Sequence, residues 1–257
     1  MTQESSTDQI TTAEPEAKPR PAWKVFLRWL GEFALYFIIA LLVVALARIF
    51  LVQPYSVPST SMENTLKKGD SIVVWKPGTI ERGAIVVFRD DLGWLEPSQT
   101  QVPWWKKGLA FLRVLPPQDE QYLVKRLIGL PGDRVTCCDD LGRITVNGQS
   151  LNETEYLYVE NSSVAQMPFD VVVPEGRVFV LGDHRDRSSD SRYHMCRGPL
   201  STPDLTFPSL ESIQGVTVAI VWPPSRWNSF STPSSFAEIP EPTGVPPPYG
   251  QAQWTCL

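Results

Sequence analysis

The longest run of apolar positions in the chain covers residues 33–52, where Arg48 and the hydroxyl of Tyr36 are the polar groups. Roughly twenty helical residues, at about 1.5 Å of rise each, cross the ~30 Å hydrocarbon core of a bilayer. Arg48 lies near the C-terminal end of the run, where a long side chain reaches the membrane surface. The pattern predicts a single-pass transmembrane anchor over residues 31–53.

The segment before the anchor predicts its orientation. Residues 1–22 are rich in polar residues and Pro and lack aromatics, so we expect residues 1–30 to form a disordered tail. Its basic residues are Lys18, Arg20, Lys24 and Arg28. By the positive-inside rule the N-terminus is cytoplasmic and the rest of the chain lies on the outer side of the cell membrane.

A cleavable signal peptide is the alternative interpretation of this segment. Ala45-Leu46-Ala47 has the small-x-small pattern of a cleavage site after an apolar run. The long polar N-terminal region and the continued apolar run at residues 49–52 favour an uncleaved anchor instead.

Beyond the anchor the pattern changes to short β-branched runs bounded by Gly and Pro. These runs are residues 71–75, 84–88, 134–136, 143–146, 178–181 and 216–221. Asn147-Gly148 follows one of them as a hairpin turn signal. No helical period is sustained, so we expect a mainly β domain over residues 54–230, with mixed sheets or a barrel-like core.

Two segments depart from the β pattern. Residues 91–120 combine Trp and Phe with Lys and Arg, which suits either contact with a membrane interface or an insertion packed on its own domain. Residues 231–257 are rich in Pro and Ser, and we expect an extended C-terminal tail.

Charge and cysteine usage narrow the function classes. The net charge is −5 and the pI about 5.2, which argues against nucleic-acid binding. The four cysteines contain no CxxC pair and only two His residues exist, so we expect no metal site. In an exported domain we favour a disulfide between Cys196 and either Cys137 or Cys138, with free buried thiols as the alternative because spacing cannot give connectivity.

Two residues suggest nucleophilic catalysis. Ser61 follows the anchor closely, and a serine hydroxyl becomes a good nucleophile when a neighbouring base removes its proton. Lys125 lies in an apolar run, where burial lowers a lysine pKa and supplies a neutral amine. Strand alternation places Lys125 on the face of Leu123 and Leu127 and Arg126 on the other. A Ser-Lys pair is a known variant of the Ser-His-Asp arrangement.

The surroundings of both residues form ordered motifs. They are Ser56 to Leu66 around Ser61, Lys67-Lys68-Gly69-Asp70, Arg82 to Phe88, Tyr122 to Asp133 around Lys125, and Gly182 to Arg192. In this order after an anchor, they resemble the motifs of bacterial type I signal peptidases from about residue 30 to about residue 228. The resemblance implies a β-rich catalytic domain of the signal-peptidase type.

The resemblance also implies roles for matching residues. Ser61 is the nucleophile, Lys125 the general base, Ser59 an oxyanion donor beside the Ser61 backbone N–H, and Ser188 the residue that orients the lysine. Asp190 would pair with an arginine such as Arg192 or Arg185. The positions that match substrate pockets are Tyr55, Val57, Leu66 and Val124.

The implied activity is that of a membrane-bound serine endopeptidase, which removes signal peptides from exported preproteins after small residues in an A-x-A pattern. Its partners would be these signal peptides and the phospholipid membrane. We expect a monomer that needs no metal or organic cofactor.

The chain departs from the family pattern at Thr60, Asn64 and His184, and it diverges after Arg192. None of these positions is the nucleophile, the base or the hydroxyl oxyanion donor.

His184 or His194 as the base is one alternative. Others are a cytoplasmic self-cleaving repressor-type protease, a sortase-type transpeptidase, and a non-catalytic β-domain that binds exported proteins. The repressor-type protease is disfavoured because no DNA-binding domain is recognisable, and the sortase-type enzyme because the cysteines lack the required His and Arg setting. The non-catalytic domain is disfavoured because both Ser61 and Lys125 are present.

Overall fold

The computed structural model describes residues 22–96, 121–158, 167–196, 205–251 and 254–256. The chain divides into two compact units, Met1–Val44 and Ala45–Leu257.

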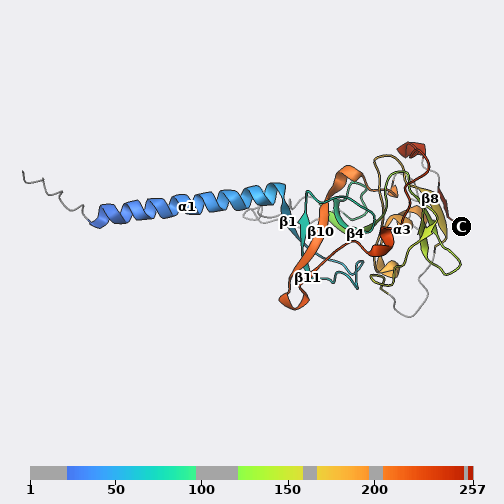
Figure 1. Ribbon diagram of the computed structural model, residues 1–257, viewed down its shortest axis with the longest axis horizontal. Coiled ribbons are helices and arrows are strands. Elements are labelled where there is room, and N and C mark those ends of the chain that lie inside the picture. The colour runs from blue at the N-terminus through green and yellow to red at the C-terminus, as the bar shows by residue number, and fades with distance from the viewer. Residues whose placement is uncertain (1–21, 97–120, 159–166, 197–204, 252–253, 257) are drawn as a thin grey trace, which may run out of the picture. The chain divides into compact units, whose positions relative to one another are not determined.

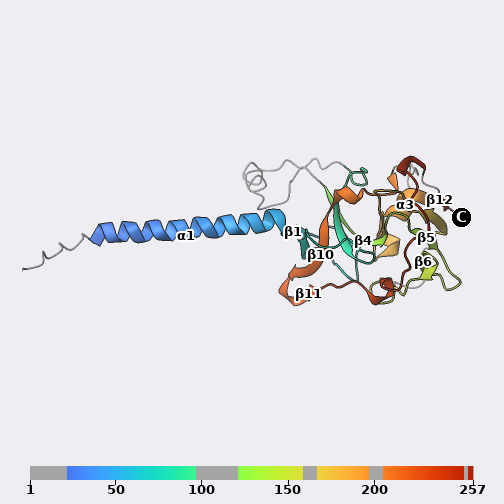
Figure 2. The same ribbon diagram turned by 45° about the horizontal axis from the view of Figure 1, so that its top comes forward.

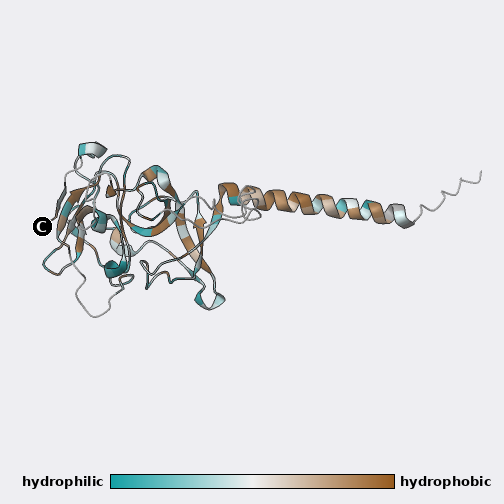
Figure 3. Cartoon of the chain, turned by 180° about the vertical axis from the view of Figure 1, so that it is seen from behind, coloured by the Kyte–Doolittle hydropathy of each residue, from teal (hydrophilic) through white to brown (hydrophobic). Residues whose placement is uncertain are grey.

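An apolar helix, α1, runs over Ala22–Phe50, and its hydrophobic colouring is seen in Figure 3. Phe26–Phe50 is long and apolar enough to cross a membrane. The helix begins earlier than the predicted anchor because no proline interrupts the sequence after Pro21. It also ends earlier, because the next strand begins at Val52.

The larger sheet carries Lys125 in one of its strands, and Ser61 lies in the connection between two others. Its strand order is β1-β2-β10-β3-β4-β9, and β11 pairs with β10. The strand pairings of this sheet among the described residues are antiparallel. The strands are β1 Val52–Ser56, β2 Ser71–Trp75, β10 Ile213–Trp222, β3 Ile85–Arg89, β4 Tyr122–Gly129, β9 Phe179–Leu181 and β11 Asn228–Ser229.

The smaller sheet has the order β12-β8-β5-β6-β7. Its strands are β12 Trp254–Cys256, β8 Phe169–Val172, β5 Arg134–Cys137, β6 Ile144–Val146 and β7 Gln149–Ser150. Figure 1 labels β1, β10 and β11 at one end of the domain and β8 at the other. Figure 2 places β5, β6 and β12 together, with β4 between the two groups.

One buried apolar cluster joins the two sheets. Ile128 of β4 and Phe179 of β9 pack with Val135 of β5 and Phe169 of β8. The rings of Phe169 and Phe179 lie 5.4 Å apart between centroids. The mainly β fold that the sequence predicted is confirmed, and all six predicted β-branched runs overlap observed strands.

The predicted cysteine pairing is wrong. Cys196 pairs with Cys256, at a Cα–Cα distance of 5.8 Å, and Cys137 with its neighbour Cys138. Cys196 ends the short helix α3, Ser191–Cys196, and Cys256 ends β12, which is paired with β8. This pairing of the two ends could not be inferred from cysteine spacing.

The C-terminal segment is Pro-rich but is not a detached tail. Phe236 and Ile239 are buried in the cluster that joins the sheets, and Trp254 packs against it. Apolar residues spaced between the prolines stabilise this packing because their burial removes apolar surface from water. Most of the 91–120 insertion lies outside the described residues. Its Trp94 packs edge-to-face on Phe88 and donates a hydrogen bond to the Leu205 carbonyl at 2.7 Å. For Trp94, the structure therefore supports packing on the protein's own domain.

Candidate active site

Ser61 begins a tight turn immediately after the extended segment that follows β1. The backbone N–H of Leu66 donates to the Met62 carbonyl at 2.7 Å, closing one helical turn. Met62 and Leu66 are both fully buried. Residues four apart on a helical turn share one face, so these two apolar side chains hold the turn on the core.

The hydroxyl groups of Ser61 and Ser59 lie 3.2 Å apart between their Oγ atoms. The Ser61 carbonyl accepts a hydrogen bond from the His184 backbone N–H at 3.0 Å. Among the described residues none accepts a backbone hydrogen bond from the Ser61 N–H. The turn therefore presents a hydroxyl and a backbone donor side by side, which is the arrangement needed to bind an oxyanion.

Lys125 lies in the middle of β4 and is 2 % exposed. Its strand neighbour in β3 is the buried Val86, and its Nζ donates a hydrogen bond to Ser188 Oγ at 2.9 Å. Burial lowers the pKa of Lys125 to about 8, although Asp190 and Asp183 favour the ammonium form. A lysine with this pKa is substantially neutral just above neutral pH and can accept a proton.

Gly182, which follows β9, lies between the Ser61 turn and Ser188, the hydrogen-bond partner of Lys125. A Cβ on Gly182 would lie within 2.5 Å of both the Ser61 carbonyl oxygen and Ser188 Cβ, and closer still to Ser188 Oγ. The Ser61 turn and the partner of Lys125 are thus packed against one glycine. Lys125 donates to Ser188 and not to Ser61 in this structure, and such contacts commonly tighten only when substrate binds.

Asp190 supports the same glycine from the other side. Its carboxylate accepts hydrogen bonds from the Gly182 N–H at 3.1 Å and from the Arg192 guanidinium at 3.3 Å. Burial acts to raise the pKa of Asp190, but Arg192 and Lys125 hold it below its ordinary value. Of the two arginines considered from the sequence, Arg192 pairs with Asp190, whereas Arg185 pairs with Glu153.

The four positions that match substrate pockets lie in one apolar cluster of the larger sheet. They are Tyr55, Val57, Leu66 and Val124, all 9 % exposed or less. Met62, the neighbour of Ser61, belongs to the same cluster. The structure therefore brings the predicted pocket residues together next to the Ser61 turn.

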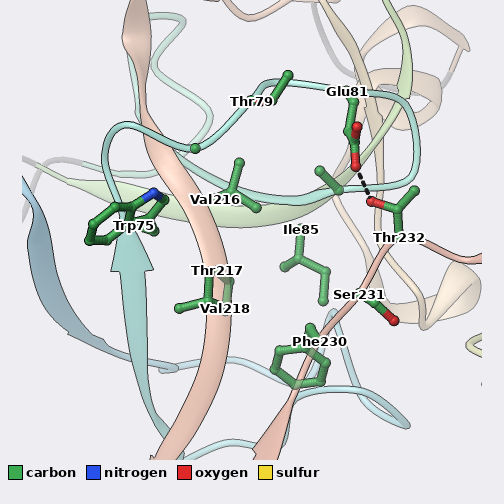
Figure 4. A pocket seen from close by; sticks show the side chains of 12 residues that line it. Trp75, Thr79, Glu81, Ile85, Val216, Thr217, Val218, Phe230, Ser231 and Thr232 are labelled. Carbon is green, nitrogen blue, oxygen red and sulfur yellow. Dashed lines mark hydrogen bonds between the residues drawn. The ribbon is translucent and has the colours of Figure 1, made fainter.

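A cavity of about 370 Å³ lies at another part of this sheet, between β10 and the start of β3. Figure 4 shows Ile85 and Phe230 in its wall and Glu81 hydrogen-bonded to Thr232. Neither Ser61 nor Lys125 lines it. The cavity is thus separate from the candidate catalytic residues.

The two histidines hold other positions. His184 contacts Ser61 by its backbone, while its ring packs on Tyr158 at 4.3 Å and its Nδ1 lies 3.6 Å from the Glu63 carboxylate. His194 stacks on Trp94 at 4.4 Å. Within the described residues neither ring is hydrogen-bonded to the Ser61 hydroxyl.

The sequence did not single out several residues that support the site. Arg126 forms a buried two-point ion pair with Asp183, at 2.8 and 2.7 Å, and Thr65 donates to the same carboxylate at 2.5 Å. Glu153 lies in a segment without any motif, so only its position beside Arg185 in the fold identifies it.

Comparison with known proteins gives consistent matches. A family model described as signal peptidase, peptidase S26, matches residues 30–222. Signal peptidase I of Mycobacterium tuberculosis (strain ATCC 25618 / H37Rv) is 36% identical over 238 residues, which cover 82% of this chain and 77% of that protein. Signal peptidase I of Bacillus licheniformis is 36% identical over 175 residues, covering 63% and 78%.

A crystal structure of a signal peptidase I from Enterococcus faecalis V583 is 30% identical, with a TM-score of 0.33, and covers 54% of this chain and 96% of that one. The fold and the family model define a peptidase with an apolar N-terminal helix and a mainly β domain. The chain belongs to the signal peptidase family, peptidase S26.

Proposed function

We propose that the protein cleaves signal peptides from exported preproteins with a Ser61–Lys125 dyad. The observation that carries this proposal is the burial of Lys125 beside Ser188 and Gly182, against which the Ser61 turn also packs. An enclosed lysine with a pKa of about 8 is suited to act as a base toward a neighbouring serine.

In this mechanism the neutral Lys125 amine takes the Ser61 proton as Ser61 Oγ attacks the scissile carbonyl carbon. The Ser59 hydroxyl and the Ser61 backbone N–H stabilise the oxyanion that forms. Lys125 then gives the proton to the leaving amine, and an acyl-enzyme remains on Ser61. Lys125 then takes a proton from a water molecule, which attacks the ester and releases the signal peptide, and Lys125 returns this proton to Ser61 Oγ. Ser188 orients the amine through its hydrogen bond, and Asp190 holds Gly182 in place.

We expect the cluster of Tyr55, Val57, Leu66 and Val124 to select small side chains. These residues leave little exposed apolar surface, so shallow pockets at this cluster would accept Ala and exclude large groups. An extended substrate would pair its backbone with the strand at the site edge. Such pockets would give an A-x-A preference at the junction.

The test is cleavage of a preprotein with an A-x-A junction by the purified full chain in detergent with phospholipid. The matched substrate carries Phe in place of the Ala before the scissile bond. We expect cleavage after that Ala, located by mass spectrometry, and at least about 100-fold slower cleavage of the Phe substrate. Equal cleavage of both substrates would contradict the specificity, and no cleavage by folded protein would contradict the function.

We also propose that α1 anchors the protein in the cell membrane as a monomer, with its N-terminus cytoplasmic and the β domain outside. The apolar length of Phe26–Phe50 and the basic residues before it support this orientation. External protease added to intact spheroplasts should digest the β domain, whereas inverted vesicles should protect it. Protection in spheroplasts would reverse the orientation.

A further inference from the structure

A buried group of charges extends from the candidate site into the segment 151–158, which carries no motif. It contains three guanidinium groups and three carboxylates, each 7 % exposed or less: Arg126, Arg185, Arg192, Asp183, Asp190 and Glu153. Each arginine pairs with one carboxylate: Arg126 with Asp183, Arg192 with Asp190 and Arg185 with Glu153. Buried charges of this kind are stable only when they are paired and hydrogen-bonded.

Glu153 is connected to the candidate site through the side chain of Arg185. It pairs with Arg185 and accepts a further hydrogen bond from the Tyr156 hydroxyl at 2.9 Å. The Arg185 Nε donates to the Gly182 carbonyl at 3.1 Å. Gly182 is the residue against which the Ser61 turn and Ser188 are packed. A shift of Arg185 would therefore move the backbone that separates the nucleophile from the partner of the base.

The other ion pairs are joined to the same network. Arg192 donates to the Arg185 carbonyl at 2.8 Å, and the Arg126 guanidinium lies over the Tyr156 ring at 4.0 Å from its centroid. Glu153 contacts Arg185 and Tyr156 contacts Arg126, so these two residues together reach two of the three arginines. Coupled buried groups of this kind contribute together, so the loss of one member affects the others.

The charge balance of the network also concerns Lys125. The three arginines and three carboxylates sum to zero, so a protonated Lys125 would be the one uncompensated charge among these buried groups. The charged or titratable groups that act on Lys125 are Asp190, Asp183, Arg192 and His194. Removal of the Glu153 charge would leave Arg185 unbalanced and add positive potential to this environment.

We propose that Glu153 is a positioning residue for the dyad. Glu153 holds Arg185 in place, and Arg185 in turn fixes the Gly182 backbone against which the Ser61 turn and Ser188 are packed. This inference rests on the proposed Ser61–Lys125 function. It assigns a role to a side chain that lies outside every motif around the two catalytic candidates. Because Glu153 does not belong to the pocket cluster, it should affect kcat and leave KM nearly unchanged.

The first variant is Glu153→Gln, which keeps the size of the side chain and removes its charge. We expect kcat to fall by about 10-fold to 100-fold, with KM within about twofold of wild type. Added positive potential disfavours the Lys125 ammonium, so the acid limb of kcat/KM should move to lower pH by roughly half a unit to one unit. The matched control is Glu155→Gln, an exposed carboxylate in the same segment, which should change neither quantity.

A double variant, Glu153→Gln with Arg185→Met, separates charge from position. It restores the charge balance but lacks the Arg185 hydrogen bond to Gly182, so the acid limb should return to the wild-type pH while kcat stays low. If Glu153→Gln alone does not fold, as judged by near-ultraviolet circular dichroism, the double variant decides the matter. Wild-type kcat in the double variant, or a folded Glu153→Gln that matches Glu155→Gln, would overturn the proposal. A wild type that cleaves no preprotein would overturn the proposed function and this inference with it.

Discussion

Replacement of Lys125 by Met should reduce preprotein cleavage by roughly 10³-fold or more while making the folded domain more stable at acidic pH. Loss of a general base commonly costs 10²-fold to 10⁴-fold, and here the same amine is proposed to serve both acylation and deacylation. Methionine has a similar length and no charge, so it fills the space left by the lysine. Lys68→Met, a change to an exposed lysine, is the matched control and should retain activity.

The stability effect follows from the direction of the pKa shift. Burial lowers the pKa of Lys125 from 10.5 in the unfolded chain to about 8 in the folded one, so folding disfavours the ammonium form. This cost is fully present below pH 8 and declines as the pH rises from 8 toward 10.5. We expect Lys125→Met to raise the free energy of unfolding at pH 6 by about 1–3 kcal/mol, with a smaller gain at pH 9.

Activity of the wild type should show the same titration. Because the proposed reaction needs neutral Lys125, kcat/KM should fall about tenfold per pH unit below a midpoint near pH 8. Thermal unfolding in detergent and initial cleavage rates from pH 5 to pH 10 measure both effects. A flat acid limb down to pH 5, or more than a tenth of wild-type activity in Lys125→Met, would contradict the role of Lys125.

Replacement of Gly182 by Ala should reduce kcat by about 100-fold, although the change adds only one methyl group. The new Cβ would lie within 2.5 Å of the Ser61 carbonyl oxygen and of Ser188 Cβ, far closer than van der Waals contact allows. Either the nucleophile turn or the partner of Lys125 must move. A displacement of about 1 Å in a catalytic group can cost on the order of 10²-fold in rate.

Gly244→Ala is the matched control because a Cβ at Gly244 meets no atom within 4 Å. It should behave as wild type. Overpacking at Gly182 should also lower the free energy of unfolding by about 1–3 kcal/mol, so rates are to be compared well below the unfolding temperature. If Gly182→Ala kept half of the wild-type kcat while folded, the close packing at this glycine would not matter for catalysis.

Local sequence patterns were sufficient for six of the strands and for the environment of Lys125. The β-branched run at residues 71–75 is β2, and the apolar neighbours of Lys125 lie in a buried strand as expected. Both features depend on residues adjacent in sequence, where alternation and β propensity act directly.

Features that depend on distant segments could not be predicted in this way. The pairing of Cys196 with Cys256 requires β12 to lie beside β8. The sequence did not predict β12, because the proline content of the C-terminal segment suggested an extended tail. The approach of Ser61 to Ser188 depends on the chain that follows β9. Glu153 has no local signal, because its partner Arg185 is brought to it only by the fold.

In the proposed mechanism Ser61 is acylated by the preprotein, with Lys125 as the base. The most direct measurement is cleavage of the A-x-A preprotein by wild type, Ser61→Ala and Lys125→Met, combined with peptide mapping of acid-quenched wild type. We predict cleavage by wild type alone and an acyl adduct on the peptide that contains Ser61. Cleavage by folded Ser61→Ala, or an adduct on another residue, would contradict the account.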